Sequence, residues 1–165
     1  MLPIVLNPAE TKIGLAGSGE AKARRRTLLA DAGVVPVDVS VDDRSALGDL
    51  DLLYVAGVTR DVSAALAGRA RAQGVLVNVE DEPSLCDFHV PATVRRGDLL
   101  LTVSSGGRSP GLVRVVREWL SAQFGTEWGK RVDELGRKRA HWRASGLSPA
   151  EVSTKTRTLA SWWFG

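Results

Sequence analysis

The stretch KIGLAGSGEAKARRRTLLADAG (residues 12–33) contains a short apolar run, two closely spaced glycines and a helix-forming segment. The run KIGLA (residues 12–16) predicts a buried strand, since it is apolar and glycines follow at once. The residues after the glycines predict a helix, which Gly33 ends as its C-terminal cap. A strand, a glycine turn and a helix in this order indicate the start of an alternating α/β fold.

The following residues continue this alternation. Apolar runs predict strands at residues 34–40, 51–56 and 75–79, and helical spacing predicts a helix at residues 61–72. Pro36 indicates an edge or bent position for the strand that contains it. Strands that alternate with helices predict a parallel sheet with right-handed crossovers.

The pattern changes after residue 79. FHVPATV (residues 88–94) and DLLLTVS (residues 98–104) flank Arg95 and Arg96, and the two runs predict a β-hairpin. Ser109 and Pro110 then open a helix that ends at Gly125. Its apolar face is expected to contain Leu112, Val115, Val116, Trp119 and Leu120.

Residues 126–165 are predicted to be helical, with a capping box at residues 148–151 before the last helix. All five tryptophans of the chain follow residue 118. We expect most of them to be packed, against the chain itself, on a partner subunit or over a substrate cleft.

Composition indicates a globular protein, since 44% of the 165 residues are hydrophobic and 25% are charged. Cys86 is the only cysteine, which excludes an internal disulfide and suggests a small core or loop residue. No apolar run is long enough to span a membrane, and the start lacks the pattern of a signal peptide. We therefore expect a cytoplasmic protein without a membrane partner.

The net charge of +3 is unevenly distributed, with basic clusters at residues 24–26, 95–96 and 137–139. These clusters indicate either an anionic partner or solvated helix faces. Glu127, Asp133 and Glu134 interrupt the basic residues, which argues against a nucleic-acid groove.

Two glycines, Gly17 and Gly19, stand where a dinucleotide pyrophosphate would meet a helix N-terminus. The third small position of that fingerprint is Lys22, so the motif alone is weak evidence for NAD. Asp42 lies about 20 residues further on, where a ribose-binding carboxylate is expected; Asp38 and Asp43 compete for this role, and a loop role is open for each. The predicted cofactor-binding residues are Gly17, Ser18, Gly19, Glu20, Ala21, Val41 and Asp42.

A longer pattern begins with NVEDEPSLCDF (residues 78–88) and continues with PATVRRGDLLLTVSSGGRSP (residues 91–110). It resembles the signature of the siroheme synthase N-terminal domain family: an Asn-Val-x-Asp element, a hairpin around Arg-Arg-Gly, and a Ser-Gly-rich helix start. LPI (residues 2–4) and the helix ending ADAG also match. The resemblance covers roughly residues 2–125 and is strongest over residues 75–110.

The resemblance implies an enzyme that oxidises precorrin-2 to sirohydrochlorin with NAD, in some members followed by insertion of ferrous iron as a substrate. It implies a homodimer and three regions: a shortened Rossmann-like parallel sheet (residues 1–79), a hairpin and helix region for catalysis and dimerisation (residues 80–125), and a helical C-terminal region (residues 126–165).

The resemblance assigns the catalytic role to Asp81, just after a predicted parallel strand, where the sites of α/β proteins are found. A carboxylate there can take the proton released in dehydrogenation, or the pyrrole protons released in metal insertion. Without the resemblance, a turn or helix cap is the preferred interpretation of this aspartate.

The Ser-Gly-rich segment offers hydroxyls, amides and a guanidinium to the carboxylates of the substrate. Its serines can equally act only as helix caps, and in some relatives the serine that matches Ser105 is phosphorylated. The predicted substrate-binding residues are Asn78, Ser104, Ser105, Gly106, Gly107, Arg108 and Ser109. His89 and His141 have no spaced ligand partners, so no metal site is predicted.

Three features depart from the family, and all lie in the nucleotide half. They are Lys22, Gly57-Val58 in place of a Thr-Asp pair, and a link from Ser40 to Asp51 that is too short for a further helix and strand. They leave an alternative open: a tetrapyrrole-binding or chelatase-only protein that has lost NAD-dependent dehydrogenation.

Overall fold

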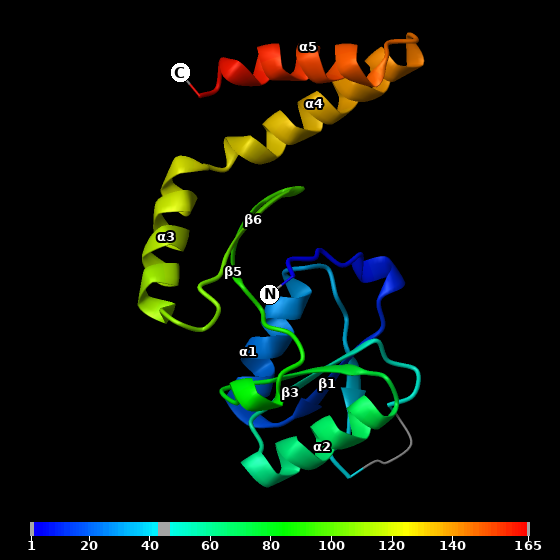
Figure 1. Ribbon diagram of the computed structural model, residues 1–165, viewed down its shortest axis with the longest axis vertical. Helices are drawn as coiled ribbons and strands as arrows, with labels where there is room; N and C mark the ends of the chain where they lie inside the picture. The colour runs from blue at the N-terminus through cyan, green and yellow to red at the C-terminus, as the bar shows by residue number, and fades with distance from the viewer. Residues whose placement is uncertain (1, 43–46, 165) are drawn as a thin grey trace. The chain divides into compact units, whose positions relative to one another are not determined.

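The computed structural model of the chain describes residues 2–42 and 47–164, which form two compact units, Met1–Val90 and Pro91–Gly165 (Figure 1). The first unit ends just after Phe88 and Val90, which still pack against its core.

The first unit alternates strands and helices, which confirms the α/β class. Its four strands are all parallel, in the order β2-β1-β3-β4. The elements are η1 (Pro8–Glu10), β1 (Ile13–Gly17), α1 (Gly19–Ala30), β2 (Val37–Val39), β3 (Leu52–Ala56), α2 (Arg60–Ala72), β4 (Leu76–Val79) and η2 (Pro83–Leu85).

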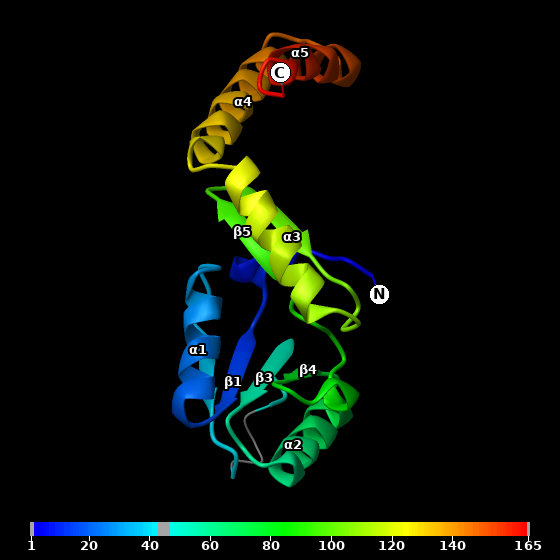
Figure 2. The same ribbon diagram turned by 90° about the vertical axis from the view of Figure 1, so that its left-hand side faces the viewer.

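Helices cover both faces of this sheet, and Figure 2 shows its strands between α1 and α2. Successive residues of β3 point to opposite faces. Leu53 joins one core with Leu66 of α2, and Leu52 joins the other with Leu29 of α1. This arrangement explains why all five residues of β3 are buried and read as one continuous apolar run.

The strand predicted at residues 34–40 is shorter than expected, since only Val37–Val39 forms β2. Pro36 stands directly before the strand, where it can donate no backbone hydrogen bond. Within the described residues β2 pairs only with β1, and the predicted edge position is therefore confirmed.

The described part of the link between β2 and β3 contains neither helix nor strand, and the sheet is shortened as expected. The link still contributes to the core, because Leu47 and Leu50 are buried. It is attached to β1 by Asp51, whose Oδ2 accepts a hydrogen bond of 2.7 Å from the Lys12 amide.

The second unit starts with the predicted hairpin and continues with helices. Arg96 joins the hairpin to the C-terminal end of the helix that follows it, by donating hydrogen bonds to the carbonyl oxygens of Phe124 (2.7 Å) and Ser121 (3.1 Å). The elements are β5 (Ala92–Arg96), β6 (Leu99–Val103), α3 (Pro110–Gln123), α4 (Glu127–Ala144) and α5 (Pro149–Ser161).

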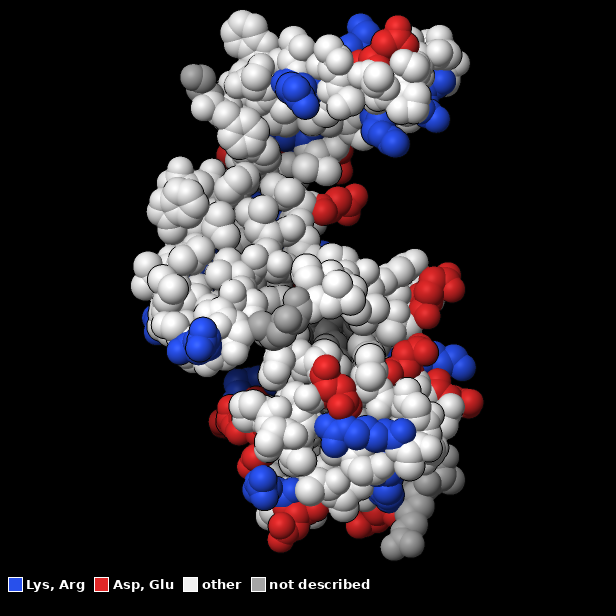
Figure 3. Space-filling model, in the orientation of Figure 1, with Lys and Arg blue, Asp and Glu red and all other residues white. Residues whose placement is uncertain are grey.

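The predicted apolar face of α3 is only partly covered by the described part of the chain. Val116 and Leu120 are half-buried, whereas Leu112, Val115 and Trp119 are 58%, 62% and 59% exposed. A two-stranded hairpin covers only part of the apolar surface of this helix. In Figure 3 the visible surface of α3 has few charged atoms.

The C-terminal tryptophans are divided between packing and exposure. Trp128 is buried and its ring lies 4.9–5.7 Å from those of Phe124, Trp163 and Phe164. Trp162 is 81% exposed. The predicted capping box is confirmed: Ser148 and Glu151 exchange hydrogen bonds at the start of α5.

Candidate active site

The turn after β1 is held against the end of β3 by its backbone. Gly17 has a φ of +121°, and a Cβ atom there would lie 1.7 Å from the Ala56 carbonyl oxygen. The next amide, of Ser18, donates to that oxygen at 3.2 Å. Only glycine fits the first position, as the sequence motif suggested.

Gly57 completes this contact from the other side. It has a φ of +69°, and a Cβ atom there would lie 2.1 Å from the Ser18 carbonyl oxygen. The Ser18 hydroxyl in turn donates to the Gly57 carbonyl oxygen at 2.9 Å. The departure from the family at residue 57 therefore has a structural reason, since the two turns touch through their backbones.

The first turn of α1 has free donors. Ser18 is the N-cap, but its side chain accepts no capping hydrogen bond because its hydroxyl is directed to Gly57. The amides of Gly19, Glu20 and Ala21 have no acceptor among the described residues. Unpaired amides at a helix N-terminus bind anions such as a pyrophosphate.

Lys22 does not crowd the contact between helix and strand. Its Nζ atom lies 2.8 Å from Asp38 of β2, which Arg26 also contacts. Hydrogen bonds from Lys22 and Arg26 hold the pKa of Asp38 below its ordinary value. Asp38 is thus already paired, which makes it a weaker candidate for a ribose contact.

Asp42 follows β2 and is exposed, and its carboxylate has no hydrogen-bond partner among the described residues. Val41 is partly buried against the core, and its carbonyl oxygen accepts a hydrogen bond from Arg69. The competing candidate Asp43 lies outside the described residues. The position of Asp42 is compatible with the predicted ribose contact, which stays a prediction.

Asp81 lies two residues beyond β4 and is exposed. Its φ of +61° makes it the one non-glycine residue with positive φ in the described part of the chain. Aspartate adopts this conformation at modest cost, and such outliers gather at functional sites. The carboxylate forms no ion pair or hydrogen bond with the described residues.

Each of the two sequence neighbours of Asp81 forms an ion pair with an arginine. Glu80 lies 3.8 Å from Arg24 of α1, and Glu82 lies 3.2 Å from Arg60 of α2. Pairing leaves Asp81 as the unpaired carboxylate of a run of three acids. Neither arginine was predicted from the sequence as a site residue. The signal that could have indicated them is the run of three adjacent acidic residues, which requires positive charges from elsewhere in the fold.

The loop that follows Asp81 is fixed by backbone hydrogen bonds and by side chains. Buried Asn78 donates from Nδ2 to the Phe88 carbonyl oxygen at 2.9 Å. The Cys86 thiol donates to the Val79 carbonyl oxygen and accepts from the Val79 amide, both at 3.2 Å. Cys86 is therefore a loop-anchoring residue, as expected, and the Asn78 oxygen Oδ1 has no donor among the described residues.

The Ser-Gly-rich loop belongs to the second unit. Ser104 accepts from the Gly106 amide (3.2 Å), Ser105 from the Ser109 amide (2.9 Å), and Ser109 caps α3. Gly106 and Gly107 both have positive φ. Each hydroxyl still has a proton to donate, and Arg108 is exposed without an ion pair among the described residues.

The first unit therefore brings three predicted features to one sheet edge. The glycine turn, Asp42 and Asp81 each follow the carboxyl end of a parallel strand. Strand order reverses between β1 and β3, and ligands of open α/β sheets bind at such a point. With strands about 4.8 Å apart, β4 lies roughly 10 Å from β1, with β3 between them.

Two absences are observed. Among residues 2–42 and 47–164, no group of three His, Cys, Asp or Glu side chains is arranged to hold a metal ion. Within the same residues, no helix is both long and apolar enough to cross a membrane.

Three features together define a Rossmann-like nucleotide-binding unit: the turn after β1, which requires glycine, the parallel sheet, and the unpaired amides at the start of α1. Consistent with this, residues 19–92 match the model of a family described as "Putative NAD(P)-binding".

Known proteins specify the family further. The chain is 36% identical over 149 residues to siroheme synthase of Azotobacter vinelandii, with 75% of this chain and 32% of that protein covered. It is 38% identical over 140 residues to siroheme synthase of Ectopseudomonas mendocina, covering 70% and 30%. The solved structure of SirC, a precorrin-2 dehydrogenase, has the same fold, with a TM-score of 0.74 at 18% identity, covering 96% of this chain and 89% of SirC.

The chain belongs to the siroheme synthase N-terminal domain family, as its residue pattern indicated. It spans about a third of the length of the siroheme synthases that it matches.

Proposed function

We propose that this chain is an NAD-dependent precorrin-2 dehydrogenase, which oxidises precorrin-2 to sirohydrochlorin in siroheme biosynthesis. The observation that carries the proposal is Asp81, an unpaired carboxylate in a strained backbone position at the same sheet edge as the glycine turn. The likeness to siroheme synthases and to the fold of a precorrin-2 dehydrogenase supports it.

The residues at the turn after β1 fit a dinucleotide. Gly17 leaves no side chain between the turn and the sheet, and the amides of Gly19, Glu20 and Ala21 can bind the pyrophosphate. Asp42 is proposed to accept hydrogen bonds from ribose hydroxyls, with Val41 supporting the turn. Bound NAD would supply the hydride acceptor for the oxidation.

Asp81 is proposed to act as the base. Dehydrogenation removes a hydride and a proton from the substrate, and the carboxylate of Asp81 takes the proton and later releases it to water. Because Arg24 and Arg60 are paired with Glu80 and Glu82, the carboxylate of Asp81 is left free for this step.

Several polar groups are proposed to bind the substrate. Ser104, Ser105 and Ser109, the amides of Gly106 and Gly107, and the Arg108 guanidinium can donate to the substrate carboxylates. The free oxygen Oδ1 of Asn78 can accept a hydrogen bond from a pyrrole N–H.

The proposed division by role follows the three predicted regions: residues 1–79 bind the cofactor, residues 80–125 contribute catalysis and dimerisation, and residues 126–165 form a helical C-terminal region. A cytoplasmic homodimer is part of the proposal. The exposed apolar side chains of α3, Leu112, Val115 and Trp119, support a subunit contact on that helix.

A second candidate function is chelation of ferrous iron by sirohydrochlorin without dehydrogenation. The shortened sheet favours it, because the described link between β2 and β3 lacks the further helix and strand expected of the family. Here iron is a substrate, and Asp81 would take pyrrole protons as the metal enters.

The two candidates are separated by anaerobic incubation with precorrin-2, with and without NAD, followed by ferrous iron, while absorbance is recorded. We expect NAD-dependent formation of sirohydrochlorin, reduced roughly 10²- to 10⁴-fold in Asp81→Asn, the usual contribution of a general base. Asparagine tolerates positive φ, so this substitution removes the base and keeps the backbone.

Asp49→Asn is the matched control, since it removes an exposed carboxylate of the same unit and should retain full activity. Insertion of ferrous iron into sirohydrochlorin supplied directly, without NAD-dependent oxidation of precorrin-2, would select the chelatase. Absence of both activities, with no stabilisation by NAD in a thermal-shift assay, would contradict both candidates.

A further inference from the structure

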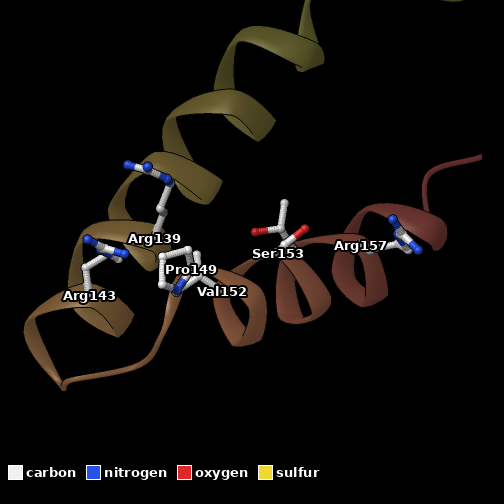
Figure 4. A pocket seen from close by; sticks show the side chains of 7 residues that line it. Arg139, Arg143, Pro149, Val152, Ser153 and Arg157 are labelled. Atoms are coloured by element: carbon white, nitrogen blue, oxygen red, sulfur yellow. The ribbon is translucent and has the colours of Figure 1, made fainter.

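A cavity of about 410 Å³ lies between α4 and α5 in the second unit. Three arginines line it: Arg139 and Arg143 come from neighbouring turns of α4, and Arg157 comes from α5 (Figure 4). Its volume lies within the roughly 300–1,000 Å³ of ligand pockets; the cavity is open to solvent, and its three arginines are exposed.

Among the described residues, no carboxylate lines this cavity. The guanidinium groups of Arg139, Arg143 and Arg157 form no ion pair with the described residues. The nearby acids along the two helices are paired elsewhere, since Glu134 lies 3.2 Å from Lys138 and Glu151 is bound to Ser148.

The other lining residues complete a binding surface. Val152 is buried at the floor of the cavity, and Pro149 lies beside it. Ser153 and Thr156 contribute hydroxyls that form no hydrogen bond with the described residues. Apolar stems and a few converging donors are the usual composition of a ligand site.

Arg139 and Arg143 lie one helical turn apart on α4, so their like charges repel, and a bound anion would turn that repulsion into attraction. Guanidinium groups bind carboxylate and phosphate oxygens in pairs of parallel hydrogen bonds. We propose that this cavity binds a small multivalent oxyanion, carrying carboxylate or phosphate groups, that bridges α4 and α5. The proposed dehydrogenation uses none of these residues.

Tryptophan fluorescence tests the proposal selectively, because all five tryptophans lie in the second unit and Lys155 of α5 stacks on Trp142 of α4. The full chain is titrated with citrate, with inorganic pyrophosphate, and with sodium chloride at matched ionic strength. We expect a saturable change and a higher unfolding temperature with citrate or pyrophosphate. The stronger of the two identifies carboxylate or phosphate as the preferred group.

Arg143→Gln and Arg157→Gln should each weaken the apparent affinity roughly tenfold, the usual effect of losing one charged hydrogen bond. Without an anion, both variants should unfold at the same temperature as the parent chain or higher, because one repelling charge is gone. This measurement identifies a variant that merely folds poorly.

Arg137→Gln is the matched control, since it removes one exposed charge from α4 outside the cavity and should leave the affinity unchanged. The proposal is wrong if sodium chloride reproduces the effect of citrate and pyrophosphate. It is equally wrong if Arg137→Gln weakens binding as much as Arg143→Gln does.

Discussion

Two loops of the first unit end at the same sheet edge but are held in different ways. The turn after β1 is fixed by backbone contacts between residues 17–18 and 56–57, where glycine is required on both sides. The loop after β4, residues 80–88, has backbone hydrogen bonds to the sheet, such as that from the Asp87 amide to the Val77 carbonyl oxygen at 2.8 Å. It depends in addition on the side chains of Asn78, Cys86 and Asp87.

This difference separates two tasks. A backbone-held turn presents amides that cannot change their direction, as a pyrophosphate site requires. A loop that side chains hold in addition to its backbone can keep one residue, Asp81, in a strained conformation with its carboxylate free. We therefore expect a methyl group added at a glycine to destabilise the turn after β1. We expect the removal of a polar side chain to destabilise the loop after β4.

The largest effect is expected for Gly17→Ala. The new Cβ atom would overlap the Ala56 carbonyl oxygen, at 1.7 Å, in a backbone conformation that alanine disfavours. Overpacking and backbone strain each cost about 1–3 kcal/mol, so the free energy of unfolding should fall by roughly 2–6 kcal/mol. Urea denaturation followed by far-UV circular dichroism measures it.

Gly68→Ala is the control for this substitution. Gly68 lies inside α2 with open space at its Cβ position. Alanine there should raise the stability by about 1 kcal/mol, the difference in helix propensity. If both alanine variants behave alike, backbone contact is not what holds the turn.

A smaller effect is expected for Asp87→Ala in the second loop. Oδ2 of Asp87 accepts from the amide of buried Val77 at 2.9 Å, and Oδ1 accepts from Arg71 at 2.8 Å. An unpaired buried amide costs roughly 1–3 kcal/mol. The same denaturation experiment should show that loss, and dehydrogenation should fall further than stability explains, because the loop that holds Asp81 shifts.

Asp87→Asn should restore part of the stability, since its amide oxygen can still accept from Val77. Ser84→Ala is the neutral control, because Ser84 is exposed in the same loop and forms no hydrogen bond with the described residues. Equal losses in Asp87→Asn and Asp87→Ala would show that the Val77 contact contributes nothing.

The sequence predicted the elements of this edge better than the contacts between them. Apolar runs such as residues 12–16 and 75–79 mark the strands, because buried parallel strands are apolar on both faces. The hydrogen bond between Ser18 and Gly57 joins residues 39 positions apart, and no local pattern encodes it. For the same reason the departure at Gly57 looked like a lost cofactor residue before its contact was visible.

The second unit was harder to predict for a related reason. The apolar spacing of α3 identified the helix and the residues of its apolar face correctly, but Leu112 and Val115 on that face are exposed and Val116 is only half-buried. Periodicity identifies which residues share a stripe. It does not specify how much of that stripe the rest of the chain covers.

The smallest effect is expected for the ion pairs beside the glycine turn, where Asp38 is fully exposed and contacts Lys22 and Arg26. These hydrogen bonds lower the pKa of Asp38 in the folded chain relative to its ordinary value of 3.8. A lowered pKa means that the stabilisation is complete above pH 3.8 and disappears as the pH falls below it.

The thermal midpoints of the parent chain and Asp38→Asn should therefore differ slightly at pH 7 and converge in acid. High salt should also reduce the difference, because exposed pairs are screened. A difference that persists at low pH would mean that Asp38 acts through packing or backbone conformation rather than charge, and that the turn after β1 also depends on side chains.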